Sequence, residues 1–331
     1  MRPKISVVIP VYNAERYVTR CLDSVQNQSL EELEVLCVDD RSTDGTLDIL
    51  HSRAEKDPRL KIITLPVNSG PAGARNKGID CASGEYVYFM DSDDWIDSDY
   101  LSSMLSEIIL TGQDVIVNPE YIEEYESFEL MNKSRDLGYT IPEAGYVSPF
   151  AVQSLIPPMV YLRMYRRSYL IENNIRFPDF RSGEDIFFTG LAEVLQKRSY
   201  IFHGPKYHYL QRERSLRRQD MSGFLFLANY KALRDEVISR GIPIDEMKLF
   251  QVGLGLKVDS EEKFIFLHEY CKEILDQVMS HLSIYNVFDV YWVKALAMSA
   301  DYEDFMSNHG ATPALKIVRQ SFSHNNNARK Q

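Results

Sequence analysis

Three carboxylates lie within four residues at the end of one apolar, aromatic run. The run is Tyr86 to Met90, and the carboxylates belong to Asp91, Asp93 and Asp94. Carboxylates that repel one another in a partly buried place are costly, and a divalent cation removes that cost. Hard Mg²⁺ or Mn²⁺ suits a few carboxylates together with phosphate oxygens. These residues alone leave two interpretations open: a metal site, or a solvated acidic turn that caps the next helix.

The run before these carboxylates is one of four segments with the pattern of β-strands, and they alternate with segments typical of helices. Asn13 is expected to cap the first helix. This alternation predicts an α/β fold with a mostly parallel sheet. The predicted strands are 5–9, 34–38, 60–64 and 86–90, and the predicted helices are 14–28, one from Thr43 or Asp44 to Ala54, and one holding 74–79.

Three of the predicted strands deliver polar residues to one edge of the sheet. Pro10 to Asn13 follow the first strand, Asp39 and Asp40 follow the second, and Asp91 to Asp94 follow the fourth. In open parallel sheets, ligands bind beyond the carboxyl ends of the strands. The convergence therefore predicts a binding crevice at this edge.

Composition narrows the class of protein. The chain has 331 residues, and its formal net charge of -11 argues against nucleic acid as a partner. Its four cysteines are widely spaced, which argues against a zinc or disulfide framework. No apolar run reaches about 18 residues, and no signal-peptide pattern is present. We expect a cytoplasmic protein that does not span a membrane, with peripheral contact at a membrane surface left open.

The second half of the chain is expected to have several further elements. Glu184 and Asp185 open a predicted helix that runs to Leu195. The other expectations are a helix over 98–110, a strand over 114–118, an irregular acidic insertion over 119–145, helices over 224–239, 261–282 and 286–300, and a disordered tail over 321–331. We expect three regions, namely 1–118, 119–222 and 223–331.

Four blocks in about the first 120 residues resemble the family 2 glycosyltransferases of the GT-A fold, and they occur in the family's order. They are Val7-Val-Ile-Pro-Val-Tyr-Asn13, Val38-Asp-Asp-Arg-Ser-Thr-Asp-Gly45, Ala74-Arg-Asn-Lys-Gly78 and Gly84-Glu-Tyr-Val-Tyr-Phe-Met-Asp-Ser-Asp-Asp-Trp95. Segments up to Tyr207-His-Tyr209 are similar to the downstream half of bacterial members, and the resemblance fades after about Ser222. It implies a Rossmann-like sheet flanked by helices, a helix-rich C-terminal extension, and sugar transfer from a nucleotide-diphosphate donor.

The resemblance assigns the acidic cluster to the donor diphosphate. Within the Asp91-Ser92-Asp93 motif, Asp93 is the implied ligand of Mn²⁺ or Mg²⁺, and Asp91 is implied near the ribose and the metal's water ligands. Asp94 either orients these two carboxylates without binding the metal itself, or caps a helix. The metal would act as a Lewis acid on the departing diphosphate.

The nucleotide is expected at the first two strand ends. The ring of Tyr12, beside Pro10, suits stacking on a pyrimidine. By resemblance, Asp40 accepts a hydrogen bond from uracil, whereas Asp39 either reaches the ribose or is structural. Asn76 and Arg75 are expected at the diphosphate or the uracil, and the alternative for Arg75 is a surface ion pair.

The acceptor hydroxyl needs a general base. Glu184 and Asp185 stand at the position of that base in inverting family members, with Asp185 preferred and Glu184 the alternative. Both also suit the first turn of a helix through its dipole alone. A lone base opposite the leaving group implies single displacement with inversion at the anomeric carbon.

Two basic features follow downstream. His208 stands where some relatives supply a metal ligand or a diphosphate contact, although a histidine between two tyrosines is also typical of a packed side chain. The dense basic run has three open interpretations: a clamp on the diphosphate, a contact with anionic lipid, or a solvated face. The run comprises Arg212, Arg214, Arg217 and Arg218.

The sequence thus predicts a metal-dependent, inverting glycosyltransferase with a UDP-sugar donor and a saccharide or lipid-linked glycan acceptor. Its C-terminal helices are assigned to acceptor binding, membrane docking or a homodimer. One alternative is a catalytically silent carbohydrate-binding or scaffold protein on the same fold. Another is a nucleotidyltransferase, which should carry a Gly-rich basic loop where this chain has Pro10-Val-Tyr-Asn13. GxGxxG and GxxxxGK[ST] are absent, which argues against a dinucleotide oxidoreductase and a P-loop NTPase.

Overall fold

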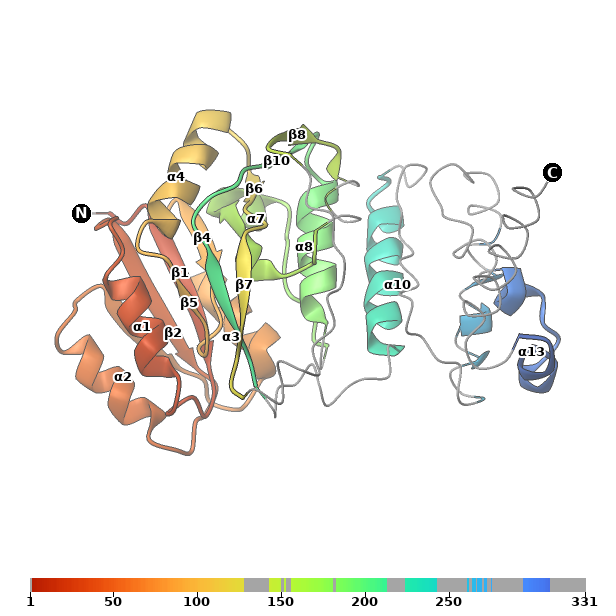
Figure 1. Cartoon of the computed structure of the whole chain (residues 1–331), viewed down its shortest axis with the longest axis horizontal. Helices are drawn as coiled ribbons and strands as arrows, with labels where there is room; N and C mark the ends of the chain where they lie inside the picture. Colours follow the sequence, from red (N-terminus) through yellow and green to blue (C-terminus); the bar gives the residue numbers. More distant parts are fainter. Residues whose placement is uncertain are drawn as a thin grey trace, which may run out of the picture. The chain divides into compact units, whose positions relative to one another are not determined.

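The chain divides into two compact units, Met1–Gln219 and Asp220–Gln331. The computed structural model describes residues 2–127, 143–149, 152, 156–180, 183–212, 224–242, positions scattered between 261 and 275, and 294–309. In Figure 1 the colours follow the sequence, and the bar gives the residue numbers.

The first unit is built on an eight-stranded sheet with the order β3-β2-β1-β4-β9-β6-β10-β8. Strands β1 to β4 run parallel, as the sequence predicted, whereas β9 is antiparallel to both β4 and β6. The predicted α/β class is therefore confirmed. The strands are β1 (Ile5–Val11), β2 (Leu33–Asp39), β3 (Leu60–Thr64), β4 (Tyr86–Phe89), β6 (Val115–Val117), β8 (Gly145–Val147), β9 (Arg163–Arg166) and β10 (Ser199–Ile201).

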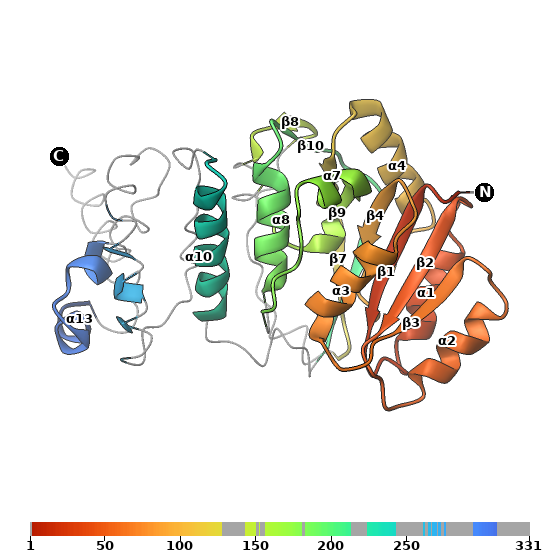
Figure 2. The same ribbon diagram turned by 180° about the vertical axis from the view of Figure 1, so that it is seen from behind.

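Helices cover both faces of this sheet. Two neighbouring residues of β4 contact them, because successive side chains of a strand point to opposite faces. In β4, the ring of Tyr88 lies 5.6 Å from that of Tyr100 in α4, and the ring of Phe89 lies 5.5 Å from that of Phe188 in α8. Figures 1 and 2 show the two faces in turn. The helices are α1 (Val18–Gln26), α2 (Thr46–Ala54), α3 (Gly70–Cys81), α4 (Tyr100–Thr111), α7 (Arg167–Glu172) and α8 (Glu184–Val194).

Helix α3 lies unusually close to the sheet. A Cβ atom at Gly78 would lie only 2.2 Å from Cγ1 of Val8 in β1, so a glycine is required there. Arg75, one turn earlier on α3, is consequently buried against the sheet rather than exposed.

A second, three-stranded sheet lies behind the acidic segment. Its order is β5-β11-β7, with β11 (Tyr207–Gln211) in the middle, antiparallel to β5 (Trp95–Ile96) and parallel to β7 (Tyr121–Tyr125). The prediction that 119–145 is irregular was wrong for its first part, because β7 pairs with β11 along its whole length. Residues 128–142 lie outside the described residues.

Asn13 does not cap a helix, so that prediction was also wrong. Its backbone is left-handed (φ 48°), and helix α1 begins only at Val18. The Asn13 carboxamide oxygen instead accepts a hydrogen bond from the Thr43 N–H at 2.8 Å. This bond ties the end of β1 to the loop after β2, and so fixes two of the strand ends that the sequence placed at the crevice.

The second unit contains α10 (Phe224–Ser239), as predicted, and α13 (Tyr302–His309), which was not predicted. The helices expected over 261–282 and 286–300, and the tail, lie largely or wholly outside the described residues. In the part of the chain that the structure describes, no helix has the length and apolar character needed to cross a membrane.

Candidate active site

One buried guanidinium joins the two groups of predicted carboxylates. Nη1 of Arg75 lies 2.7 Å from Oε1 of Glu184 and 3.3 Å from Oδ1 of Asp185, and Nη2 lies 2.8 Å from Oδ1 of Asp91. Burial lowers the pKa of Arg75, but the carboxylates of Asp185, Asp91 and Glu184 outweigh it and hold that pKa above its ordinary value. Arg75 is therefore a bridge inside the site rather than the surface ion pair weighed from the sequence.

Asn76 has a structural contact in place of the predicted donor contact. Its Nδ2 donates to the carbonyl of Phe177 at 2.8 Å, and its Oδ1 accepts from the N–H of Phe177 at 2.9 Å. The amide group is thus paired on both sides with one backbone residue. The ring of Phe177 lies under Arg75, 5.3 Å from the guanidinium carbon, so Asn76 helps to place the bridge.

The start of α8 presents two carboxylates with unequal access. Gly183 occupies the N-cap with a left-handed backbone (φ 80°), and Glu184 and Asp185 form the first turn. The side chain of Asp185 is 23% exposed and that of Glu184 is 10% exposed. Burial raises the pKa of Asp185 to about 7 even though Arg75 lowers it. Oδ2 of Asp185 also accepts a hydrogen bond from the Val160 N–H at 3.2 Å.

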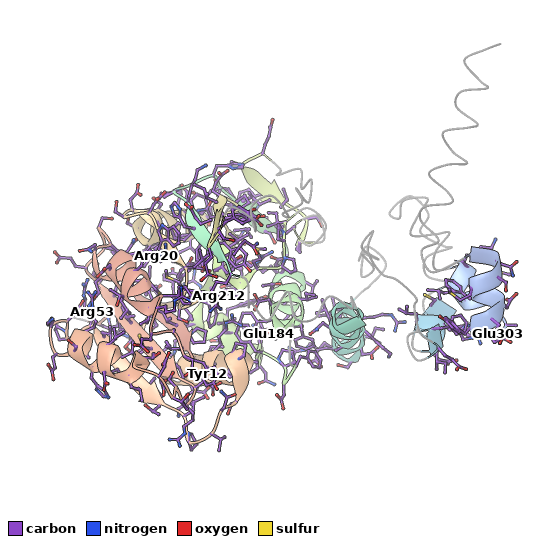
Figure 3. All side chains as sticks on the ribbon, turned by 60° about the horizontal axis from the view of Figure 1, so that its bottom comes forward. Tyr12, Arg20, Arg53, Glu184, Arg212 and Glu303 are labelled. Atoms are coloured by element: carbon purple, nitrogen blue, oxygen red, sulfur yellow. The ribbon has the colours of Figure 1, made fainter. Side chains whose placement is uncertain are left out.

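The second carboxylate group follows β4 and is balanced by another arginine. Nε of Arg212, at the end of β11, lies 2.5 Å from Oδ2 of Asp93. Burial raises the pKa of Asp93 to about 6, against the lowering effect of Arg212, and Asp91 raises it further. Figure 3 labels Arg212, together with Glu184 and Tyr12. The other arginines of the basic run lie outside the described residues.

Asp94 is not a helix cap. Its side chain is completely buried, where it accepts hydrogen bonds from the Tyr207 hydroxyl at 2.5 Å and from the Leu210 N–H at 2.7 Å. The Tyr207 hydroxyl also accepts a bond from the Asp91 N–H at 3.3 Å. Asp94 thus fastens the acidic turn to β11. Tyr207 was not predicted as a site residue, although it lies beside His208 in the Tyr-His-Tyr segment.

His208 is a packed side chain, which is the second of the two interpretations that the sequence offered. Its ring stacks on Trp95 with 5.0 Å between centroids. Nε2 lies 3.1 Å from Oδ1 of Asp97, and Nδ1 lies 3.4 Å from Oε1 of Glu124. Both ring nitrogens are therefore occupied, which leaves neither facing Asp93 as the metal-ligand prediction requires.

The carboxylates of Asp91 and Asp93 are of the type that binds a divalent cation. Among the described residues, no three His, Cys, Asp or Glu side chains are arranged to hold a metal. Asp91 and Asp93 supply two carboxylates of the hard type that Mg²⁺ and Mn²⁺ prefer, and such ions keep water or phosphate oxygens as further ligands. The burial that raises the pKa of Asp93 also means that a nearby cation stabilises its ionised form.

The predicted nucleotide residues lie where β1 and β2 end. Tyr12 directly follows β1, and its side chain is half exposed. Oδ1 of Asp40 accepts a hydrogen bond from the Ser69 N–H at 2.6 Å, and burial raises the pKa of Asp40. Oδ1 of Asp39 accepts from the Ser42 N–H at 3.2 Å. Oδ2 of Asp39 is buried and has no hydrogen-bond partner among the described residues.

Two further predicted residues have only a location. Pro10 lies within β1, paired in register with Val38 of β2. Ser92 lies in the turn after β4, partly exposed between Asp91 and Asp93. The structure thus gathers the predicted residues at one edge of the sheet, with the exception of His208.

The chain is similar in sequence to known glycosyltransferases. The family model "Glycosyl transferase family 2" matches residues 6–177. The putative glycosyltransferase EpsH of Bacillus subtilis is 33% identical over 213 residues, which cover 62% of this chain and 60% of EpsH. The poly(ribitol-phosphate) beta-N-acetylglucosaminyltransferase TarS of Staphylococcus aureus is 32% identical over 220 residues, which cover 62% of this chain and 35% of TarS.

Solved structures show the same fold. The crystal structure of S. aureus TarS 1-349 in complex with UDP matches with a TM-score of 0.72 at 24% identity, over 96% of this chain and 92% of that one. The mannosyltransferase PcManGT from Pyrobaculum calidifontis, in complex with GDP-Man and Mn²⁺, matches with a TM-score of 0.55 at 19% identity, over 98% of this chain and 80% of that one.

The sheet with its flanking helices is therefore the GT-A fold that the sequence predicted. The chain belongs to glycosyl transferase family 2.

Proposed function

We propose that this protein transfers a sugar from a UDP-sugar to a glycan or lipid-linked acceptor, with a divalent metal and with inversion. The observation that carries the proposal is the Arg75 bridge. One guanidinium pairs with Asp91 at the donor end and with Asp185 at the start of α8. The leaving group and the base of a single displacement must lie this near to each other to act on one anomeric carbon.

At the nucleotide, Tyr12 would stack on the uracil and Asp40 would accept a hydrogen bond from the base. The half-exposed ring of Tyr12 supports this assignment, because a stacking platform must be accessible. Asp39 is assigned to the nucleoside because Oδ2 of its buried carboxylate has no partner among the described residues. A hydroxyl of the ribose would supply the hydrogen bond that such a buried oxygen requires.

At the diphosphate, Asp93 and Asp91 would hold Mn²⁺ or Mg²⁺. When bound, the metal supplies Lewis-acid stabilisation of the charge on the leaving diphosphate. The presence of Mn²⁺ beside GDP-Man in the Pyrobaculum calidifontis protein supports this choice, since that protein shares the fold. Arg212 forms an ion pair with Asp93 and would face the phosphates if a metal replaced it as the partner of Asp93.

At the acceptor, Asp185 is the base and Glu184 supports it. Asp185 has the more exposed side chain, while Glu184 makes the shorter contact with Arg75. A pKa of about 7 suits a group that must lose and regain a proton near neutral pH. The acceptor hydroxyl gives its proton to Asp185 as its oxygen attacks the anomeric carbon, and UDP leaves on the opposite side.

The relatives support the substrate classes in general terms. TarS is named for transfer of N-acetylglucosamine to poly(ribitol-phosphate), and its crystal structure contains UDP. A phosphate-containing or saccharide acceptor is accordingly proposed here. We assign acceptor binding and the catalytic base to residues 119–222. Residues 223–331 would serve acceptor binding, membrane docking or dimerisation, on the cytoplasmic side.

Thermal stabilisation by nucleotides tests the donor assignment. UDP and a panel of UDP- and GDP-sugars would be added to the protein with Mn²⁺, with Mg²⁺, or with EDTA. We expect UDP compounds to raise the melting temperature only when metal is present, because ligand binding to the folded state stabilises it. The Asp93→Ala variant should lose this response.

Asp99→Ala is the matched control, because Asp99 is an exposed aspartate that lies just beyond β5 and makes no side-chain cap bond to α4. It should respond as the unchanged protein does. If no nucleotide stabilises the protein under any condition, or if Asp93→Ala responds fully, the proposal is wrong in its donor or its metal.

A further inference from the structure

A charged pair lies in the core of the first unit, away from the carboxylates of the candidate active site. Nε of Arg163 in β9 pairs with Oε1 of Glu193 in α8, and both side chains are 0% exposed. Apolar residues of similar volume often stabilise a protein as well as a buried ion pair does, or better. Stability alone therefore does not explain charges at this place.

Arg163 also holds a turn of the backbone. Its Nη1 donates to the carbonyl of Pro157 at 3.0 Å and to the carbonyl of Met159 at 2.9 Å. The planar guanidinium makes these bonds while its Nε faces Glu193, which the single ammonium of a lysine does not reproduce. Arg163 thus connects α8 to the segment 157–162, which we call the 157–162 turn and which ends in the short helix η1 (Val160–Leu162).

The 157–162 turn contacts the base end of the site. The Val160 N–H donates to Oδ2 of Asp185 at 3.2 Å. Asp185 and Glu193 lie at opposite ends of α8, about 12 Å apart along its axis at about 1.5 Å per residue. The ion pair therefore reaches the base only through the turn and the helix.

The same turn contacts the metal end. The ring of Tyr161 stacks on that of Tyr207, with 4.0 Å between centroids, and the Tyr207 hydroxyl binds Asp94. The Tyr161 carbonyl accepts a hydrogen bond from the Tyr88 hydroxyl at 2.8 Å. A displaced turn would therefore disturb the geometry of both carboxylate groups.

We propose that Arg163 and Glu193 are positioning residues for sugar transfer. They fix the 157–162 turn so that the Val160 amide orients the carboxylate of Asp185 toward the acceptor. The use of Asp185 as a base rests on the proposed function, whereas the positioning of the turn does not. Neither Arg163 nor Glu193 touches the substrates in this account, so donor affinity should not depend on them.

A paired apolar replacement separates positioning from stability. In Arg163→Met combined with Glu193→Leu, neither charge is left alone in the core, so the melting temperature should fall by less than in either single variant. The turn nevertheless loses both bonds from Nη1. We expect kcat to fall by about tenfold to a hundredfold, with the Kd for UDP and the KM for the donor within about twofold.

Hydrogen exchange of the 157–162 turn gives a readout that needs no activity. The double variant should exchange the Val160 amide faster than the unchanged protein does. Tyr169→Phe is the matched control, because it removes a different hydrogen bond to α8, the one that the Tyr169 hydroxyl donates to the Ala192 carbonyl at 2.8 Å. This control should leave kcat and the exchange of the turn unchanged.

The outcomes are distinct. A folded double variant with unchanged kcat, or with unchanged exchange of the turn, overturns the inference. If the unchanged protein transfers no sugar, the proposed function fails, and the exchange of the turn still decides the positioning. Should the double variant not fold, Arg163→Lys replaces it: this variant keeps a positive charge near Glu193, and we expect the same loss of kcat with UDP affinity retained.

Discussion

Two arginines balance the carboxylates of the site in different ways. Arg75 is 5% exposed and contacts three carboxylates, whereas Arg212 is 33% exposed and, among the described residues, forms an ion pair with Asp93. A buried, multiply bonded ion is held firmly because its release leaves charges uncompensated, and a partly exposed pair is exchanged with solvent or ligand at little cost. Under the proposed function, the base end (Asp185 with Arg75) is arranged before substrates bind, whereas at the metal end (Asp91 and Asp93) a metal would replace Arg212 as the partner of Asp93.

The largest expected effect separates the two ends by their chemistry. Asp185→Asn keeps the shape of the side chain and removes the base, so the kcat for transfer should fall by about a thousandfold. UDP should bind with metal as before, because the donor end is unchanged. Steady-state transfer and calorimetry with UDP measure the two quantities. Transfer retained in this variant would move the base to Glu184 or elsewhere.

The second prediction compares the two arginines by stability. Arg75→Met leaves three carboxylates without their buried partner, so the free energy of unfolding should fall by about 3–5 kcal/mol. Arg212→Met should lower it by less, because it leaves only one carboxylate, that of Asp93, without this partner. Urea unfolding of both variants measures the difference. Equal losses would contradict the distinction between a fixed and an exchangeable end.

The third prediction uses pH. Burial raises the pKa of Asp185 to about 7 and that of Asp93 to about 6. A base acts only when unprotonated, so kcat should fall about tenfold per pH unit below pH 7. A metal ligand must also be unprotonated, so the metal affinity should weaken only below about pH 6. Coinciding profiles of kcat and metal affinity would show that the two ends titrate as one group.

The smallest expected effect concerns the link between the ends. Tyr207→Phe removes the hydroxyl that binds Asp94 and the Asp91 N–H, while the ring that stacks on Tyr161 is kept. Leaving the buried Asp94 with one fewer donor should lower stability by about 1–3 kcal/mol. The metal affinity should weaken about fivefold, with the kcat at saturating metal nearly unchanged. A larger loss in kcat than in metal affinity would place Tyr207 at the base end instead.

Local patterns predicted the fold well, and they predicted the strand ends at which the candidate site residues lie. Apolar strands with aspartates at or just after their ends, Asp39-Asp40 and Asp91 to Asp94, are visible in the sequence, because strand period and strand ends are properties of short segments. The contacts between site residues that lie far apart in the sequence were not predicted. Arg75 meets Glu184 109 residues later, and nothing near Arg75 in the sequence indicates that its charge is buried.

Other errors have the same physical origin. The acidic residues of β7 argue against a strand locally, yet pairing with β11 fixes them as one. Arg163 and Glu193 were overlooked because isolated charges usually indicate the surface. The family resemblance implied His208 as a metal ligand, whereas its ring nitrogens face Asp97 and Glu124.

The configuration of the new glycosidic bond tests the central claim most directly. A single base at Asp185, with the leaving diphosphate held by the metal end, requires attack from the side opposite UDP. The product of transfer from an α-linked UDP-sugar should therefore be β-linked, as read from the proton NMR coupling of its anomeric hydrogen. An α-linked product would contradict the account, because retention needs a covalent or front-side route that this placement of Asp185 does not provide.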